Sequence, residues 1–230
     1  PYPRWNVPIA GQISWNRNSI VDIGASGGVG EIYLSPDNLQ ESVYYYGDNV
    51  GSSNYLHNPA NIFIEGQPIG LFYGYKFKGI VQEGQEGIPL AQGGEPRLPG
   101  QREYMDLNGN GYIDVDDRTI IGDSNPDFMF GFSTSFTWKD LTLSASFDGC
   151  YGNEIFNSNL PQISDVCYNG NIRSYWNVKR DAYFKAWTPQ NPNTTYPALG
   201  FASNNAERYL VTDVFVEDGS FLRVSNVSLS

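Results

Sequence analysis

The most regular alternation of apolar and polar residues lies between Phe128 and Tyr151. Every second position of its first half builds a mostly aromatic row of Phe128, Phe130, Phe132, Thr134, Phe136 and Trp138. The second half continues an apolar row through Leu141, Leu143, Ala145, Phe147, Gly149 and Tyr151. Lys139-Asp140 changes the phase between the halves in the way that a two-residue hairpin turn requires. The pattern predicts two paired antiparallel strands, residues 128–138 and 141–151.

Two details of this hairpin favour a membrane β-barrel over a soluble β-sandwich. Aromatic residues stand near the ends of the apolar rows, at Phe128, Trp138 and Tyr151. Ten residues that rise by ~3.3 Å each and tilt by about 40° span roughly 25 Å, the height of the apolar band of outer-membrane barrels. The opposite rows consist mainly of Ser and Thr, which suit a water-filled lumen, whereas Lys and Glu are usual on the solvent face of a sandwich.

Two further segments repeat this design. The first is closed by tryptophan at both ends and comprises Trp5, Val7, Ile9, Gly11, Ile13 and Trp15. Pro8 lies within it and weakens the prediction of a central strand, because proline has no N–H to donate. The second segment, residues 220–230, alternates through Phe221, Leu222, Val224, Val227 and Leu229. Its alternation breaks near Ser225-Asn226, which predicts a β-bulge, and the sequence stops inside this strand.

Long stretches rich in Gly, Asn, Pro and Tyr separate the predicted strands, roughly Gly24–Asn125 and Gly152–Asp218. Loops of this length are abnormal in a compact soluble domain but normal on the outer side of a transporter barrel. Gly70–Val81 also has strand character. If the predicted strand 5–15 runs outward and the strand 128–138 runs inward, however, the chain must cross the membrane an even number of times between them, and one crossing by Gly70–Val81 would break this rule. We therefore expect Gly70–Val81 to be extended structure above the membrane, and the short Lys139-Asp140 turn to face the periplasm.

Composition agrees with an all-β fold and excludes some classes of function. Aromatic residues make up 15% of the chain and charged residues 17%, and 25 Gly and 14 Pro supply turns. The formal net charge of −11 argues against nucleic acid as a partner, because phosphate binding requires clustered Lys and Arg. The sequence contains no apolar run of about 18 residues for a transmembrane helix, and its first residues do not resemble a signal peptide.

Residues 106–117, DLNGNGYIDVDD, match the calcium loop of an EF-hand. The predicted oxygen ligands are the side chains of Asp106, Asn108, Asn110, Asp114 and Asp117 and the backbone carbonyl of Tyr112. Gly111 would permit the sharp turn, and Ile113 would anchor the loop in a core. Hard oxygen donors of this kind suit Ca²⁺, and we expect a structural ion. The last ligand is Asp where an EF-hand has Glu, and no amphipathic helices flank the loop, so an Asn-Gly turn without metal is the alternative.

Other candidate sites are weaker. Gly24–Gly30 is glycine-rich without the spacing of a phosphate-binding loop, so we expect a flexible loop. His57 has no arrangement of Ser, Cys or carboxylate beside it, and nothing marks Glu31 or Glu65 as an acid–base pair for hydrolysis. The second long stretch holds aromatic residues that suit stacking on sugars or peptides as well as loop packing: Tyr168, Tyr175, Trp176, Tyr183, Phe184 and Trp187.

The two cysteines, Cys150 and Cys167, allow one disulfide between a strand end and the following loop. Such a bond is compatible with an oxidising compartment. The sequence leaves the pairing of these cysteines open.

Several motifs, in their order along the chain, resemble the C-terminal part of the SusC/RagA family of TonB-dependent outer-membrane transporters of Bacteroidetes. The matching segments are residues 65–70 (EGQPIG), 73–80 (YGYKFKGI), 104–118 (YMDLNGNGYIDVDDR), 121–122 (IG), 126, 131, 147–157 (FDGCYGNEIFN) and 218–229 (DGSFLRVSNVSL). Each piece alone is a weak signal. Their combination covers almost the whole chain and is specific.

The resemblance implies an all-β fold, part of a large transmembrane antiparallel β-barrel with long extracellular loops, in the bacterial outer membrane. Barrels of this family have about 22 strands around an N-terminal plug. We therefore expect residues 1–230 to be the C-terminal portion of such a barrel, a fragment without the plug, with loop 106–117 in an extracellular loop. The resemblance further implies contact with outer-membrane lipid, a SusD-like surface lipoprotein as partner, and import of oligosaccharides or peptides powered through TonB, with no enzymatic activity.

Two other classes of function compete with this interpretation. The first is a soluble secreted β-module that binds glycans and is stabilised by calcium. The second is a surface glycoside hydrolase, for which the sequence gives no positive signal. Release of the protein by a carbonate wash without detergent would favour either of them over a transporter.

Overall fold

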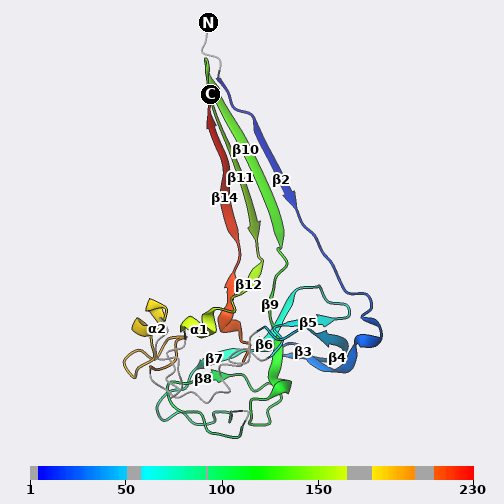
Figure 1. The fold of residues 1–230 in the computed structure, drawn as a ribbon, viewed down its shortest axis with the longest axis vertical. Coiled ribbons are helices and arrows are strands. Elements are labelled where there is room, and N and C mark those ends of the chain that lie inside the picture. Colours follow the sequence, from blue (N-terminus) through cyan, green and yellow to red (C-terminus); the bar gives the residue numbers. More distant parts are fainter. Residues whose placement is uncertain (1–4, 51–57, 92, 165–177, 200–209) are drawn as a thin grey trace. The chain divides into compact units, whose positions relative to one another are not determined.

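The computed structural model describes residues 5–50, 58–91, 93–164, 178–199 and 210–230 (Figure 1). The chain divides into two units. Unit 1 comprises residues 1–18, 123–155 and 218–230, and unit 2 comprises residues 19–122 and 156–217. Among the helices of the described ranges, none has the length and apolar character needed to cross a membrane.

Unit 1 is a five-stranded antiparallel sheet, whose long strands run side by side in Figure 1. Its strands are β1 (Trp5–Asn6), β2 (Ile9–Ser14), β10 (Phe128–Trp138), β11 (Leu141–Tyr151) and β14 (Phe221–Leu229). Both β1 and β2 pair with β10, then β10 pairs with β11, and β11 pairs with β14. The predicted strand 5–15 is therefore divided at Val7-Pro8, where proline cannot donate to the ladder.

The predicted hairpin of β10 and β11 is confirmed in its bounds and register. Trp138 lies opposite Leu141, and Phe128 lies opposite Tyr151. Lys139 has a φ of 55°, the conformation that a tight two-residue hairpin turn needs at its first position. The apolar rows of the two strands consequently share one face, where the rings of Phe128 and Tyr151 stack with centroids 5.3 Å apart.

The predicted bulge in β14 lies at Ser225. Ser146 pairs with Asn226 and the next residue, Phe147, pairs with Val224, so Ser225 has no opposite residue. The Ser225 hydroxyl instead donates a hydrogen bond to the Ser146 carbonyl at 3.0 Å. Because of this extra residue, Val224 and Val227 point to the same apolar face although they are three positions apart.

The apolar face of unit 1 is largely uncovered. The relative exposure is 67% for Ile9, 46% for Phe136 and 62% for Val227, which lie on three different strands. Every residue of β2 and β14 is exposed. A contiguous apolar surface of this kind marks an interaction with another apolar phase or another protein surface, because monomeric soluble proteins rarely expose one.

Unit 2 contains a small closed barrel formed by β3, β4, β5, β6 and β9. These strands are β3 (Gly28–Ser35), β4 (Asn38–Tyr46), β5 (Asn61–Ile64), β6 (Leu71–Tyr75) and β9 (Arg118–Asp123). A second pair comprises β7 (Phe77–Ile80) and β8 (Arg102–Tyr104). The barrel core is a cluster of Ile32, Ile62, Ile64, Leu71 and Tyr73. Strand character predicted for Gly70–Val81 is confirmed by β6 and β7.

Arg118, at the start of β9, is buried between two tyrosine rings of the barrel. Its guanidinium lies 4.7 Å from the centroid of Tyr46 and 5.0 Å from that of Tyr73. Burial raises the pKa of both phenols, with the Arg118 charge opposing that shift. These contacts hold the cation against aromatic faces in the core, where such interactions are stronger than in water.

The described parts of the stretch Gly24–Asn125 thus contain more regular secondary structure than the sequence predicted. The prediction of a flexible loop over Gly24–Gly30 is wrong, because Gly24–Ser26 forms the 3-10 helix η1 and β3 begins at Gly28. The glycines accommodate a close neighbour here, since a Cβ on Gly27 would meet the Val43 side chain at 2.7 Å. The high glycine content of this segment led to the prediction of a loop, whereas β3 begins within it at Gly28.

The remaining elements lie in or beside the stretch Gly152–Asp218. They are β12 (Glu154–Phe156), α1 (Leu160–Ser164), α2 (Arg180–Phe184), the 3-10 helix η4 (Asp213–Phe215) and β13 (Val216–Asp218). One more 3-10 helix, η2 (Val115–Asp117), directly precedes β9. Strands β12 and β13 form a two-stranded sheet. The predictions on His57 and on the pairing of Cys150 with Cys167 involve residues outside the described ranges, as do those on Tyr168, Tyr175 and Trp176.

Candidate functional site

The predicted calcium loop connects β8 to β9 in unit 2, with strands and a single 3-10 turn around it. Its fold follows from short polar side chains that accept backbone hydrogen bonds. Asp106 accepts from the N–H groups of Gly109 and Gly111, at 2.7 and 2.8 Å. Asn108 accepts from Asn110 N–H at 3.0 Å. Gly111 has a φ of 83°, so its predicted role in the sharp turn is confirmed.

Asp117 closes the loop from inside unit 2. Its carboxylate is fully buried and accepts from the N–H groups of Leu107, Asn108 and Asp114, at 2.8, 3.3 and 2.8 Å. Burial raises the pKa of Asp117, and the hydrogen bonds from Asp114, Leu107 and Asn108 oppose that rise. The side chain of Asp114 caps the same turn by accepting from Asp116 N–H at 2.9 Å.

The apolar side of the loop is anchored as predicted. Ile113 is buried in a cluster with Tyr75, Tyr104 and Leu210. On the other side of the loop strand, Leu90 donates to the Gly111 carbonyl and accepts from Ile113 N–H, both at 2.9 Å. The loop is therefore held at both flanks by the core of unit 2.

The donor chemistry of this loop suits a hard cation, but its carboxylates are not gathered around one point. Asn110 accepts from Tyr112 N–H at 2.7 Å and donates from its amide nitrogen to Asp114 at 2.8 Å. No group of three or more His, Cys, Asp or Glu side chains among the described residues is placed to hold a metal ion. A cation bound here would need Asn108, Asn110 and the Tyr112 carbonyl as ligands, and would replace the contact between Asn110 and Asp114.

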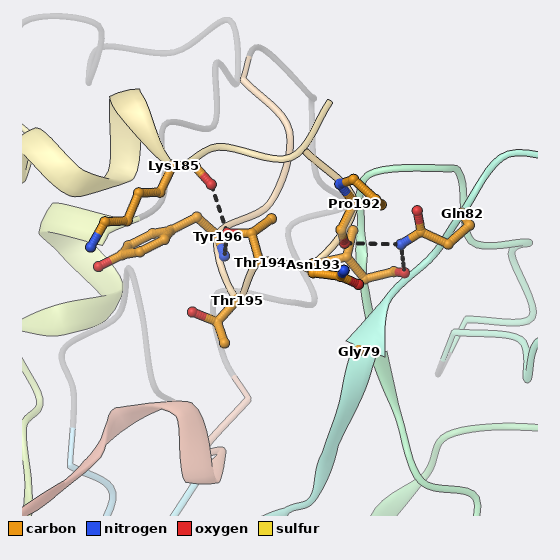
Figure 2. Close-up of a pocket in the computed structure, with 9 residues that line it drawn as sticks. Gly79, Gln82, Lys185, Pro192, Asn193, Thr194, Thr195 and Tyr196 are labelled. Atoms are coloured by element: carbon orange, nitrogen blue, oxygen red, sulfur yellow. Dashed lines mark hydrogen bonds between the residues drawn. The ribbon is translucent and has the colours of Figure 1, made fainter. Parts of the chain in front are cut away.

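A second candidate site is a pocket of about 550 Å³ in unit 2 (Figure 2). Its lining is rich in hydroxyl and amide groups and consists of Gly79, Ile80, Gln82, Lys185, Pro192, Asn193, Thr194, Thr195 and Tyr196. Gln82 links the walls, because its amide nitrogen donates to the carbonyls of Ile80 and Pro192 at 2.5 and 3.4 Å. Its carbonyl accepts from the Trp187 indole N–H at 3.1 Å.

The Lys185 side of this pocket carries a neutralised charge. The Lys185 ammonium group lies 2.8 Å from the Asp181 carboxylate, one helical turn earlier. This hydrogen bond lowers the pKa of Asp181 and raises the pKa of Lys185. Figure 2 shows the Lys185 side chain beside the Tyr196 ring, with Thr194 donating to the Lys185 carbonyl at 2.6 Å. The pocket therefore offers hydrogen-bond donors and acceptors to a polar, uncharged group.

The aromatic residues predicted for stacking divide into two groups. Trp187 is only 7% exposed and packs with Ile80 and Ala198, so it supports the pocket and does not face a ligand. Tyr183 and Phe184 on α2 are 56% and 69% exposed, with ring centroids 5.3 Å apart in an edge-to-face arrangement. These two rings remain available for contact with a ligand or a partner.

The polar face of unit 1 is the third feature with a functional character. Ser133, Ser146 and Asn226 lie in one row across β10, β11 and β14. In a neighbouring row, Arg223 forms an ion pair with Asp148 at 2.8 Å. Closer to the hairpin turn, the hydroxyls of Thr137 and Thr142 are 3.1 Å apart. Small hydroxyl groups and one compensated charge pair make this face hydrophilic without a strong field of either sign.

Sequence reasoning found the loop and the polar row but missed the pocket. The pocket is formed by β7 and the segment 192–196. The hydrogen bond from Gln82 to Pro192 links residues that are 110 positions apart in the sequence. No local motif marks either segment. The two segments lie close together because both flank the buried cluster of Ile80, Trp187 and Ala198.

Comparison with known proteins shows that the chain is similar to TonB-dependent receptors. It is 33% identical to TonB-dependent receptor P3 of Formosa agariphila, over 76% of this chain and 16% of that protein. It is 31% identical to TonB-dependent receptor P26 of the same organism, over 95% of this chain and 19% of that protein. TonB-dependent receptor SusC of Bacteroides thetaiotaomicron is 23% identical over 94% of this chain and 17% of its own length.

Solved structures agree on the fold. The RagAB peptide transporter matches 98% of this chain and 20% of its own chain, with a TM-score of 0.59 and 21% identity. No protein-family model matches the chain. The chain thus spans less than a fifth of the length of each curated relative reported above.

Proposed function

Because this chain is a segment of a SusC/RagA-type TonB-dependent transporter, we propose that the whole protein imports nutrients across the bacterial outer membrane. In this proposal unit 1 supplies part of the barrel wall, and unit 2 belongs to the extracellular side. The cargo is an oligosaccharide or a peptide, the energy arrives through TonB, and a SusD-like surface lipoprotein is the partner. The chain has no catalytic task. The similarity to the RagAB peptide transporter supports the fold of such a wall, and the cargo of this protein is left to experiment.

One observation supports this function above the others. The sheet of unit 1 has an exposed apolar face, with Ile9, Phe136 and Val227 in its rows, and a face of small hydroxyl groups. In an outer-membrane barrel, lipid would cover the apolar face and the water of the lumen would hydrate the face of small hydroxyl groups. A soluble glycan-binding module would leave the apolar face in water.

The function is tested by extraction and surface labelling of the full-length transporter in cells. We expect the protein to stay in the membrane during a carbonate wash and to require detergent for release. In a background with Cys150 and Cys167 replaced by serine, Lys139→Cys should resist a membrane-impermeant maleimide on intact cells. Glu86→Cys, at an exposed position of unit 2, should react.

The two cysteine variants serve as controls for each other. Both should react fully after the cells are lysed, which shows that each thiol is accessible in principle. Release by carbonate alone would refute the transporter and favour the soluble module. Strong labelling of Lys139→Cys on intact cells, with Glu86→Cys protected, would reverse the proposed topology.

We also propose that loop 106–117 binds one structural Ca²⁺ through Asp106, Asn108, Asn110, Asp114, Asp117 and the Tyr112 carbonyl. The donor set and the turn at Gly111 support this assignment. Extracellular calcium sites with affinities of about 10⁻⁴ to 10⁻³ M remain filled outside the cell. A bound ion would hold the exposed half of the loop, residues 108–112, in one conformation.

Calcium removal tests this proposal on the purified full-length protein in detergent. Chelation should increase proteolysis near Gly109, and millimolar Ca²⁺ should restore resistance in the wild type. Asp106→Asn keeps one oxygen, which can accept from the Gly109 or the Gly111 amide but not from both, and it removes a charge, so the calcium response should weaken about tenfold or more. Protection that does not depend on calcium in either protein would show that hydrogen bonds alone order the loop.

A further inference from the structure

Two asparagines of loop 106–117 each directly precede a glycine, at Asn108-Gly109 and Asn110-Gly111. In such a pair the backbone nitrogen of the glycine can attack the side-chain amide carbon of the asparagine, because glycine has no side chain that shields the nitrogen. The loop therefore contains two positions at which an asparagine can be converted to an acidic residue without any enzyme.

This reaction, deamidation, begins when a base removes the proton of the glycine N–H. The nitrogen then forms a bond to Cγ of the asparagine, the bond between Cγ and Nδ2 breaks, and Nδ2 takes up a proton from water and leaves as ammonia. Water opens the resulting cyclic succinimide at either carbonyl group and gives aspartate or isoaspartate. Water is the only co-reactant consumed, so the reaction requires no cofactor and no binding cleft.

One carboxylate holds both of the attacking nitrogens. Gly109 N–H donates to Asp106 Oδ1 at 2.7 Å, and Gly111 N–H donates to Asp106 Oδ2 at 2.8 Å. Removal of either proton would create a negatively charged nitrogen beside a carboxylate, and a nearby like charge disfavours the charged form of a group. Attack on Cγ also requires the hydrogen bond to break. Asp106 therefore opposes the first step at both sites.

The side chains that would be attacked are also held, although not equally. Asn108 Oδ1 accepts from Asn110 N–H at 3.0 Å, and among the described residues the Asn108 amide group is held through this oxygen alone. Asn110 Oδ1 accepts from Tyr112 N–H at 2.7 Å, and Asn110 Nδ2 donates to Asp114 Oδ2 at 2.8 Å. Because both ends of its amide group are held, Asn110 is the more strongly restrained of the two asparagines.

We propose that Asp106 protects both Asn-Gly pairs of the loop from deamidation by holding the two glycine N–H groups. When these bonds open, Asn108 and Asn110 become modification sites. At Asn110 the reaction would place a carboxylate beside Asp114 in place of a hydrogen-bond donor, so the modified loop would also lose that contact. Every contact in this argument joins residues within 106–114, so the protection requires neither a bound cation nor a contact from the rest of the transporter.

Asp106→Ala tests this role on the full-length protein in detergent, with a chelator present so that no metal ion contributes. After incubation in mildly alkaline buffer, peptide mass spectrometry measures the conversion of amide to acid at each asparagine. The rate at Asn108 should rise about tenfold or more, because the hydrogen bond from the neighbouring glycine to a charged group is lost. The rate at Asn110 should rise less, since Tyr112 and Asp114 still hold its side chain.

Asp116→Ala is the matched control, because it removes an exposed carboxylate from the same loop and leaves Asp106 in place. It should change both rates by less than about twofold. Asp106→Asn keeps one acceptor oxygen for the two glycine amides, so its summed rate should lie between those of the wild type and Asp106→Ala. This variant decides the test if the alanine variant fails to fold. The unfolded wild type in denaturant gives the rates without protection.

Equal rates in Asp106→Ala and Asp116→Ala would overturn the inference, and so would wild-type rates at Asn108 and Asn110 that match those of the unfolded chain. A rise in Asp106→Ala to the unfolded rate at both asparagines would indicate that the whole loop has lost its fold. Asp106→Asn then decides, because a raised rate supports the inference and a wild-type rate refutes it. Transport does not enter any of these results, so the inference and the proposed function can fail independently.

Discussion

Gly74→Ala should open unit 2 at β6 and lower the local free energy of unfolding by about 3 kcal/mol. Gly74 is buried, and a Cβ at this position would overlap the Val211 carbonyl oxygen. It would also lie 2.8 Å from the Val211 carbonyl carbon and 3.0 Å from Ile121 Cδ1. The Val211 backbone cannot retreat freely, because its carbonyl accepts from Tyr75 N–H at 2.8 Å.

Hydrogen exchange on the full-length protein measures this effect. The amides of β6 should lose about 100-fold in protection, since each 1.4 kcal/mol corresponds to a factor of ten. Gly79→Ala on β7 is the control, because nothing lies within 4 Å of a Cβ built there. Alanine at that position should leave protection unchanged or raise it slightly. Equal protection in Gly74→Ala and wild type would show that the backbone around Val211 can move away.

Asp117→Ala should destabilise unit 2 by about 3 kcal/mol, with or without a metal ion in the loop. The change removes the acceptor of three backbone N–H groups, those of Leu107, Asn108 and Asp114, around a fully buried side chain. A buried donor without an acceptor costs about 1–3 kcal/mol, and these three donors are partly buried, so water would recover part of that loss. Thermal unfolding and proteolysis near the loop should both register the change.

Asp116→Ala is the matched control, because the neighbouring Asp116 side chain is exposed. Its effect should remain within about 0.5 kcal/mol. A loss of stability for Asp117→Ala that disappears in excess Ca²⁺ would contradict the hydrogen-bonding role. Equal stability of the two variants would contradict it as well.

The buried carboxyl group of Asp117 also has a pH signature. Burial raises its pKa above the ordinary value of 3.8, so the folded state holds this proton more tightly than the unfolded state. The contribution to stability is therefore complete below pH 3.8 and is lost as the pH rises through the folded-state pKa. Asp117→Asn should remove this decline from the stability profile, although it remains less stable than the wild type near neutrality.

The sequence by itself determined the strands of unit 1. A period of two with aromatic ends specifies β10 and β11, because shifting the register by one residue would turn every apolar side chain to the polar face. The phase change at Lys139-Asp140 specified the turn, and the break at Ser225-Asn226 specified the bulge. Local chemistry also specified the loop 106–117, since short Asp and Asn side chains bond to backbone groups only a few positions away.

Only the tertiary structure showed that the glycine-rich stretch Gly24–Asn125 contains a small closed barrel. Its strands are short, and they close a barrel because β9 returns to pair with β3 across eighty-six positions, at Tyr33 and Thr119. Contacts of that separation leave no periodic signal in the sequence, and the core that they close, around Ile62 and Leu71, draws its residues from several strands. The pocket at Gln82 likewise joins segments that are far apart in the sequence, so no local pattern predicts it.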